Sequence, residues 1–174
     1  FTKVDLKDGS GPHNLIVAPD GGVWYAGNRT ALIGRYDPNG KSIEEIPMPD
    51  EAARDPHTLV MDEEQEHIWF TVQGGNMIGR LTLEGRKVDL VTSMTERSRP
   101  YGVKIAPDGS IWVALYGVNK LANLDPETME MREITLPRDE ARPRRLEVTR
   151  DGRVWYGDFA KGVLGAYDPK TKQF

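Results

Sequence analysis

Hydrophobic and polar positions alternate along most of this chain with a period of two, which is the period of a half-buried β-strand. Leu15 and Val17 alternate with their neighbours, an Asp20-Gly21 turn signal follows, and a second apolar run begins at Val23. Asp-Gly between two such runs favours a hairpin, because glycine adopts positive φ without a Cβ clash. No stretch has sustained helical periodicity. The pattern therefore predicts antiparallel β-structure throughout.

The same pattern occurs four times. Each copy begins at a proline, has a tryptophan in its middle and an aliphatic residue nine positions after the tryptophan. Subtraction of the residue numbers gives separations of 44, 44 and 43 between the prolines. These landmarks are Pro12, Pro56, Pro100 and Pro143, and Trp24, Trp69, Trp112 and Trp155. A repeat of this length made of short strands is typical of a propeller blade.

Further strands are predicted after each hairpin, two in each of the first three copies and one in the last. Third strands are expected around residues 33–36, 78–81, 121–124 and 164–167, and fourth strands, polar on alternate residues, at 43–46, 88–91 and 131–134. We therefore expect an all-β propeller fold with four blades of four antiparallel strands, about 43 residues each, in one domain over residues 1–174. The four tryptophans are expected to pack between blades, since an amphipathic ring suits a half-buried strand.

The two ends of the sequence resemble each other in pattern. Residues 2–6 match the fourth-strand pattern of residues 132–136, and residues 172–174 fall where that strand would begin in the last copy. This predicts that an N-terminal strand, residues 1–7, completes the last blade of this chain or of a partner. Three arrangements stay open: a closed four-bladed ring, a homodimer that closes an eight-bladed ring, and a segment of a larger propeller.

The amino-acid composition indicates which kinds of molecule the protein is not expected to bind. The 174 residues carry a net charge of -4 with both signs interspersed, so no basic surface for nucleic acid is expected. No window approaches the roughly 18 apolar residues of a membrane helix, so no membrane partner is expected. The absence of cysteine excludes disulfides and cysteine-ligated zinc. Localisation stays open between cytoplasmic and exported.

Three motifs of the first copy resemble the repeat of the streptogramin lyases (virginiamycin B lyases) and their bacterial relatives. They are Pro-His-Asn-Leu at 12–15, Asp-Gly-Gly-Val-Trp-Tyr at 20–25 and Ile-Gly-Arg-Tyr-Asp-Pro at 33–38, and the likeness extends over all four copies. The resemblance implies a soluble bacterial propeller, which in characterised members has seven blades. It also implies magnesium-dependent elimination that opens the lactone ring of a cyclic peptide antibiotic.

The resemblance also assigns positions to the catalytic groups. The family's general base is a histidine directly after the blade-starting proline, and a glutamate three residues after the tryptophan supports the metal. A base near neutral pKa removes a proton alpha to a carbonyl, and a divalent cation stabilises the resulting charge. The corresponding pairs here are His13 with Gly27, His57 with Val72, Tyr101 with Leu115, and Arg144 with Asp158. No blade has both groups.

The candidate residues therefore divide between two functions. For a lyase, His13 and His57 are the candidate general bases and Asp158 the candidate ligand of Mg²⁺, with His13 beside Asp158 if blade 4 abuts blade 1. For a binding propeller, a rim at the channel mouth would hold a small-molecule or peptide ligand; it consists of Tyr101, Tyr116, Arg144, Arg145 and Phe159.

Each candidate also has a structural interpretation: histidines hydrogen-bonded at the rim, an ion pair involving Arg144 or Asp158, and aromatic packing. The missing histidine–acid pair favours the binding propeller over the alternative, a metal-dependent carbon–oxygen lyase. Whether the chain is an enzyme stays undecided at this stage.

Overall fold

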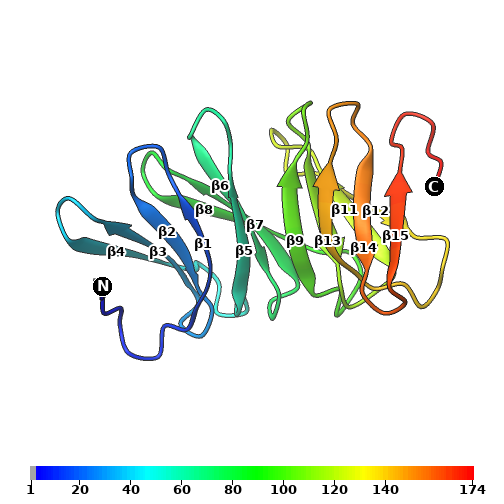
Figure 1. Ribbon diagram of the computed structural model, residues 1–174. Helices are drawn as coiled ribbons and strands as arrows, with labels where there is room; N and C mark the ends of the chain where they lie inside the picture. The colour runs from blue at the N-terminus through cyan, green and yellow to red at the C-terminus, as the bar shows by residue number, and fades with distance from the viewer. Residues whose placement is uncertain (1–2) are drawn as a thin grey trace.

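The computed structural model describes residues 3–174, and over that range every regular element is a β-strand. No helix long and apolar enough to cross a membrane occurs in this range. The strands form four antiparallel sheets, which we call blades 1 to 4 and which stand side by side along the molecule (Figure 1).

The strand bounds follow the predicted repeat. Blade 1 contains β1 (Pro12–Val17), β2 (Val23–Gly27), β3 (Leu32–Asp37) and β4 (Ser42–Pro47). Blade 2 contains β5 (Pro56–Met61), β6 (His67–Val72), β7 (Met77–Thr82) and β8 (Lys87–Thr92). Blade 3 contains β9 (Pro100–Ile105), β10 (Ile111–Leu115), β11 (Lys120–Leu124) and β12 (Met131–Thr135), and blade 4 contains β13 (Pro143–Val148), β14 (Val154–Asp158) and β15 (Val163–Tyr167).

Consecutive strands pair within each blade, so the predicted all-β, propeller-like array is confirmed. One feature differs from the prediction, and another concerns the closure that the sequence left open. Blade 4 has three strands, although an isolated bridge between Asp168 and Gln173 turns the chain back where the other blades begin their fourth strand. The array is also not closed, because blade 1 and blade 4 lie at opposite ends (Figure 1).

The hairpin turns have the backbone that the sequence predicted. Gly21, Gly109 and Gly152 adopt φ of 84°, 83° and 87° between the first two strands of blades 1, 3 and 4. Blade 2 has Gln65 in the same region, at φ 58°. There the Asp62 carboxylate accepts backbone N–H groups from the end of the turn, which replaces the conformational freedom of glycine with a local hydrogen-bonded turn.

A glycine in the third strand makes room for an aromatic ring from the second. The pairs directly across the strands are Tyr25 with Gly34, Phe70 with Gly79 and Tyr156 with Gly165. A Cβ at any of these glycines would overlap the facing ring. These rings fill the face opposite to the tryptophan in blades 1, 2 and 4, whereas blade 3 has Val113 across from Ala122 at this position.

The tryptophans pack between successive blades, with one exception. Trp24, Trp69 and Trp112 are each 2% exposed within clusters that join blades 1 and 2, 2 and 3, and 3 and 4. Trp155 is 41% exposed, so its expected burial is wrong for the described chain. The reason is geometric, because the tryptophan face of blade 4 has no blade beside it (Figure 1).

Two apolar faces are therefore exposed at the ends of the array. The open face of blade 4 presents Trp155 and Leu164, of which Leu164 is 77% exposed. The open face of blade 1 presents Leu15, Val17 and Ile43. At each internal interface, a face like that of blade 4 packs against a face like that of blade 1. The two open faces could therefore pack against each other in the same way.

The N-terminal strand does not form within the described residues. Residues 3–11 contain no strand, and none of them pairs with β15. Residues 1 and 2 of the predicted strand lie outside the described part of the chain. The N-terminal segment thus does not complete blade 4 of the same chain here, and completion of a partner's blade stays a prediction.

A buried carboxylate joins blade 3 to the loop that leads into it. Glu133 is 3% exposed at its side chain and accepts bonds from Ser93 Oγ at 2.8 Å, Thr95 N at 3.0 Å and Lys120 Nζ at 2.9 Å. Burial raises its pKa, but hydrogen bonds from Thr95, Lys120 and Ser93 outweigh burial and lower the pKa to about 2.

We expect Glu133→Gln to lower the free energy of unfolding at pH 7 by about 1–3 kcal/mol, since it removes charged hydrogen bonds from a buried site. The pKa of Glu133 is depressed in the folded state, from its ordinary value of 4.5 to about 2. Its stabilisation is therefore complete above pH 4.5 and is lost as pH falls toward 2. Urea unfolding at pH 7 and at pH 2.5 measures this, with the exposed Glu127→Gln as control. An equal loss at both pH values would contradict the charge argument.

We also expect the chain to associate through its open faces. Light scattering should give a molar mass above the monomer value, and the double variant W155D/L164D should restore the monomer, as should L15D/V17D on the complementary face. Met94→Asp, at an exposed apolar residue away from both faces, is the control. A discrete dimer would support the eight-bladed closure and polydisperse material would reject it. A monomer at every concentration would contradict the association itself.

Candidate functional site

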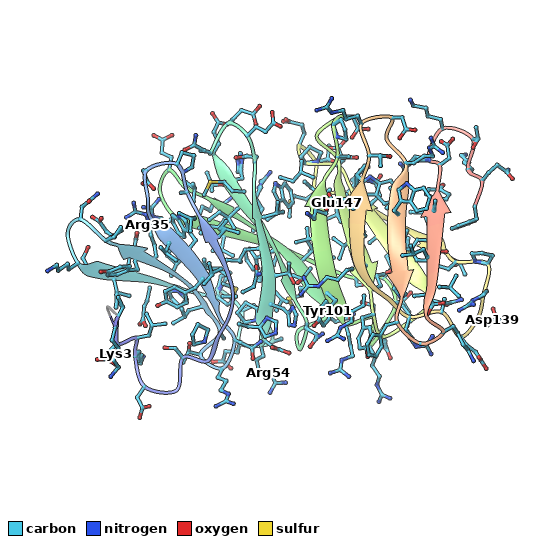
Figure 2. The ribbon with its side chains drawn as sticks, in the orientation of Figure 1. Lys3, Arg35, Arg54, Tyr101, Asp139 and Glu147 are labelled. Carbon is cyan, nitrogen blue, oxygen red and sulfur yellow. The ribbon has the colours of Figure 1, made fainter. Side chains whose placement is uncertain are left out.

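The residues that follow the blade-starting prolines lie in one row. The innermost strands β1, β5, β9 and β13 are neighbours, so their second residues come together. The ring centroids of His13 and His57 are 3.8 Å apart, and those of His57 and Tyr101 are 4.1 Å apart. The Arg144 guanidinium then lies 4.9 Å from the Tyr101 ring centroid. Figure 2 shows Tyr101 at the lower end of the inner strands.

A second set of rings, four residues after the tryptophans, surrounds Arg144. The rings of Tyr116 and Phe159 are 6.0 Å apart in an edge arrangement, and Tyr116 is 5.6 Å from Tyr101. The Arg144 guanidinium is 4.6 Å from the Phe159 centroid and donates a 2.9 Å hydrogen bond to Tyr101 Oη. Arg145 lies 5.0 Å from the Tyr101 centroid. We call these five residues the aromatic–arginine layer.

Backbone contacts between blades hold this layer in place. Thr71 Oγ1 donates a 2.8 Å hydrogen bond to the carbonyl of Tyr101 and accepts the N–H of Thr58 at 3.2 Å. Gly102 allows β13 to approach β9, because a Cβ at this position would lie 2.9 Å from the Arg144 carbonyl oxygen. The side chains of the layer are thus fixed by strands and not by loops alone.

The two histidines differ in exposure. His57 is 4% exposed, and its Nδ1 lies 3.0 Å from Thr58 Oγ1. Burial, together with positive charge at His13, Arg145 and Arg144, lowers the pKa of His57 to about 4. His57 is therefore neutral at pH 7 and shielded from solvent. His13 is exposed at the end of the row.

Asp158 has structural partners. Its residue is 2% exposed, its Oδ2 forms an ion pair with Arg138, and its Oδ1 accepts the N–H groups of Arg142 and Ala160, both at 3.1 Å. The ion pair expected for this acid is therefore present, with Arg138 and not with Arg144. The carboxylate therefore connects the loop before β13 to the turn after β14 by hydrogen bonds.

The donors expected for Mg²⁺ do not come together in this chain. Over residues 3–174, no group of three or more His, Asp or Glu side chains could hold a metal ion. The only acid at the family's metal position, Asp158, is neutralised by Arg138. His13 and Asp158 belong to blades at opposite ends of the array (Figure 1). Magnesium binding through an added blade or a second copy stays a prediction.

The two positions that the family assigns to the base and the acid are nevertheless neighbours in each sheet. Each position three residues after a tryptophan is the strand partner of the blade-starting proline, as in Pro12 with Gly27 and Pro143 with Asp158. The geometry that would bring a base near an acid is thus repeated in every blade. What differs from the family's pattern is the pair of side chains at those positions.

A groove of about 460 Å³ lies beside the aromatic–arginine layer. Tyr101, Arg144, Arg145 and Phe159 line it together with residues that sequence reasoning did not single out, chiefly Gly157 and Leu164. The period-two pattern of β15 is the signal that could have placed Leu164 on an outward face. Tyr116 packs within the layer against Tyr101, Phe159 and Arg144 and is not part of the groove wall.

Four blades with equivalent residues gathered at one mouth define a protein of the β-propeller class. A sequence model of the Virginiamycin B lyase family matches residues 2–173. The chain therefore belongs to the Virginiamycin B lyase family. No curated protein sequence matches it significantly.

Solved structures show the same fold. Selenomethionine-substituted virginiamycin B lyase from Staphylococcus aureus matches at TM-score 0.81 and 23% identity, over 95% of this chain and 58% of that one. A streptogramin B lyase matches at TM-score 0.82 and 24% identity, over 94% and 57%. A catalytically inactive histidine-to-alanine form of the S. aureus lyase, solved with quinupristin, matches at 0.82 and 22%, over 98% and 60%. The chain thus spans about three fifths of the length of these relatives.

The pKa of His57 gives a direct test of this site. We expect its ring to titrate near pH 4 in an NMR titration, because burial and neighbouring cations disfavour the protonated form. Since the folded-state pKa lies below the ordinary histidine value of 6.5, the folded protein loses stability as pH falls from 6.5 toward 4. Arg145→Gln should raise the pKa and Arg153→Gln, at a distant turn, should not. A midpoint near 6.5 would show that His57 is solvated.

Proposed function

We propose that this chain is a ligand-binding propeller whose aromatic–arginine layer receives a small molecule or peptide at the channel mouth. The observation that carries the proposal is the stacking of Arg144 on the rings of Tyr101, Tyr116 and Phe159 at the edge of a groove of about 460 Å³. Aromatic surface with a few placed polar groups is typical of small-molecule sites.

The relatives add support at the level of the fold. A catalytically inactive form of the S. aureus lyase was solved with quinupristin, so a propeller of this fold is known together with that ligand. A ligand of that size would need a broad mouth. The exposed ring of Phe159 and the partly exposed ring of Tyr116 offer contact area to such a ligand.

Lyase activity is the second candidate, and His13 favours it. This histidine is exposed at the position that the resemblance gives to the general base. His57 suits the role less, because a buried group with a pKa of about 4 is poorly matched to proton abstraction near pH 7. The acid that would complete the site has to come from outside blade 1, where Gly27 occupies its position.

Binding and catalysis are separated by one experiment on quinupristin and a set of neutral aromatic fragments. We expect chemical-shift changes at Tyr101, Tyr116 and Phe159 on binding and a loss of about tenfold or more in affinity in the F159A variant. Quinupristin incubated with Mg²⁺ should stay cyclic, with no new olefinic proton in its NMR spectrum, which is the readout needed because elimination opens the ring without a change of mass. The control variant is Glu127→Gln at a remote turn. Shift changes elsewhere, or none, would reject the binding proposal, and ring opening that disappears in H13A would establish the lyase.

A further inference from the structure

Neighbouring blades leave clefts at the end of the array where the first strand of each blade turns into the second, which is the upper end in Figure 1. The cleft between blades 1 and 2 has a volume of about 280 Å³, and the cleft between blades 3 and 4 has one of about 310 Å³. A tryptophan that is 2% exposed lines each cleft, Trp24 in the first and Trp112 in the second. Both clefts lie between packed blades, so neither belongs to the open faces of blades 1 and 4.

The cleft between blades 1 and 2 neutralises its own cations. Arg35 pairs with Asp20 at 2.6 Å. Arg86, from the turn after β7, pairs with Glu44 on β4 at 2.9 Å. The two guanidinium groups lie 5.8 Å and 5.3 Å from the Trp24 ring centroid. Each arginine that lines this cleft therefore has a carboxylate partner.

Equivalent positions in the cleft between blades 3 and 4 carry different charges. The cross-strand neighbours run Trp24, Arg35, Glu44 in blade 1 and Trp112, Asn123, Arg132 in blade 3. Arg132 thus occupies the position of Glu44. In blade 4, Lys172 occupies the position of Arg86, since both have positive φ, 58° and 56°, in the turn after the third strand. The two positions that form an ion pair in the first cleft are therefore both cationic here.

The cations that line this cleft without a carboxylate partner are Arg132, Arg150 and Lys170. Within residues 3–174, no Asp or Glu oxygen lies at ion-pair distance from any of them. The two acids of the lining are held by their own turns. Asp108 Oδ1 accepts the N–H and the O–H of Ser110 at 3.1 Å and 2.7 Å. Asp151 pairs with Arg153. The cleft therefore has an excess of positive charge.

A buried amide orients one of these cations. Asn123 is 6% exposed, and its Oδ1 accepts the Nε–H of Arg132 at 2.9 Å. This is the one hydrogen bond of the Arg132 side chain within the described residues, so the terminal amino groups of the guanidinium stay available for a ligand. Pro107 of blade 3 and Pro169 of blade 4 add apolar surface to the walls. The cleft thus combines an oriented guanidinium with an apolar wall.

We propose that the cleft between blades 3 and 4 binds a phosphate monoester. The three cations contact the phosphate, and the two prolines contact the organic part. A phosphate monoester carries about two negative charges at pH 7 and three acceptor oxygens, so it matches several cations better than a carboxylate does. A volume of about 310 Å³ is within the range of small-molecule sites. The site lies at the opposite end of the array from the aromatic–arginine layer, so it does not rest on the function proposed above.

The test compares phenyl phosphate with benzoate, inorganic phosphate and phenol. NMR titration measures the affinities from the backbone amide signals of Ser110, Gly152 and Lys170, at a protein concentration where light scattering gives a single species. We expect phenyl phosphate to bind about tenfold or more tightly than benzoate and than inorganic phosphate, and phenol not to bind. The affinity for phenyl phosphate should fall as salt is raised.

Variants of Arg132 assign the binding to the cleft. Arg132→Gln should lower the affinity for phenyl phosphate about tenfold, and Arg132→Lys should recover part of the loss because it restores charge without the planar fork. Arg132→Glu restores the acid that blade 1 has at this position and should abolish binding. The matched control is Arg54→Gln, at an exposed arginine at the lower end of the array (Figure 2), which should leave binding unchanged. Urea unfolding establishes that each variant remains folded.

Several results would overturn this site. They are equal binding of phenyl phosphate and benzoate, inorganic phosphate that binds as tightly as the ester, and equal losses in R132Q and R54Q. Phenyl phosphate that shifts the signals of Tyr101 and Phe159 instead of those in the cleft would place the anion at the aromatic–arginine layer and overturn the cleft site as well. Absence of binding by every anion would overturn the cleft site and leave the binding function of the layer to its own test.

Discussion

The structure depends on the burial of one face of each blade against the next. Trp24, Trp69 and Trp112 are almost fully removed from solvent in these interfaces. A tryptophan buries about 200 Å², which at about 25 cal/mol per Å² gives about 5 kcal/mol as an upper estimate for each. No single blade could bury this area alone, because a blade is one sheet and cannot cover its own two faces. The packing of blade on blade is therefore what makes the strands stable.

The same packing creates the site. Because each blade meets its neighbour in the same way, the first strands lie next to one another and equivalent residues form a row. His13, His57, Tyr101 and Arg144 are far apart in sequence, yet the repeat alone makes them neighbours. The repeat fixes where these side chains lie, and single substitutions fix which chemistry they offer. A family position can thus lose an acid or gain an arginine without any change of fold.

Much of this was predictable from the sequence because period and landmarks repeat. The strand positions and the Asp-Gly turns follow from local rules, and the rim residues Tyr101, Tyr116, Arg144, Arg145 and Phe159 follow from their offsets from the prolines and tryptophans. The exposure of Trp155 was missed because its burial depends on a neighbouring blade and not on its own strand. The partner of Asp158 was missed because Arg138 lies in a loop, where no period fixes direction.

The charges along the row affect the protonation of His57. A protonated His57 would sit in a buried position next to His13 and within the field of Arg144 and Arg145, so the folded chain keeps it neutral. A row built by repetition thus couples its positions electrostatically: burial lowers the pKa of His57 most, and the neighbouring His13, Arg145 and Arg144 lower it further.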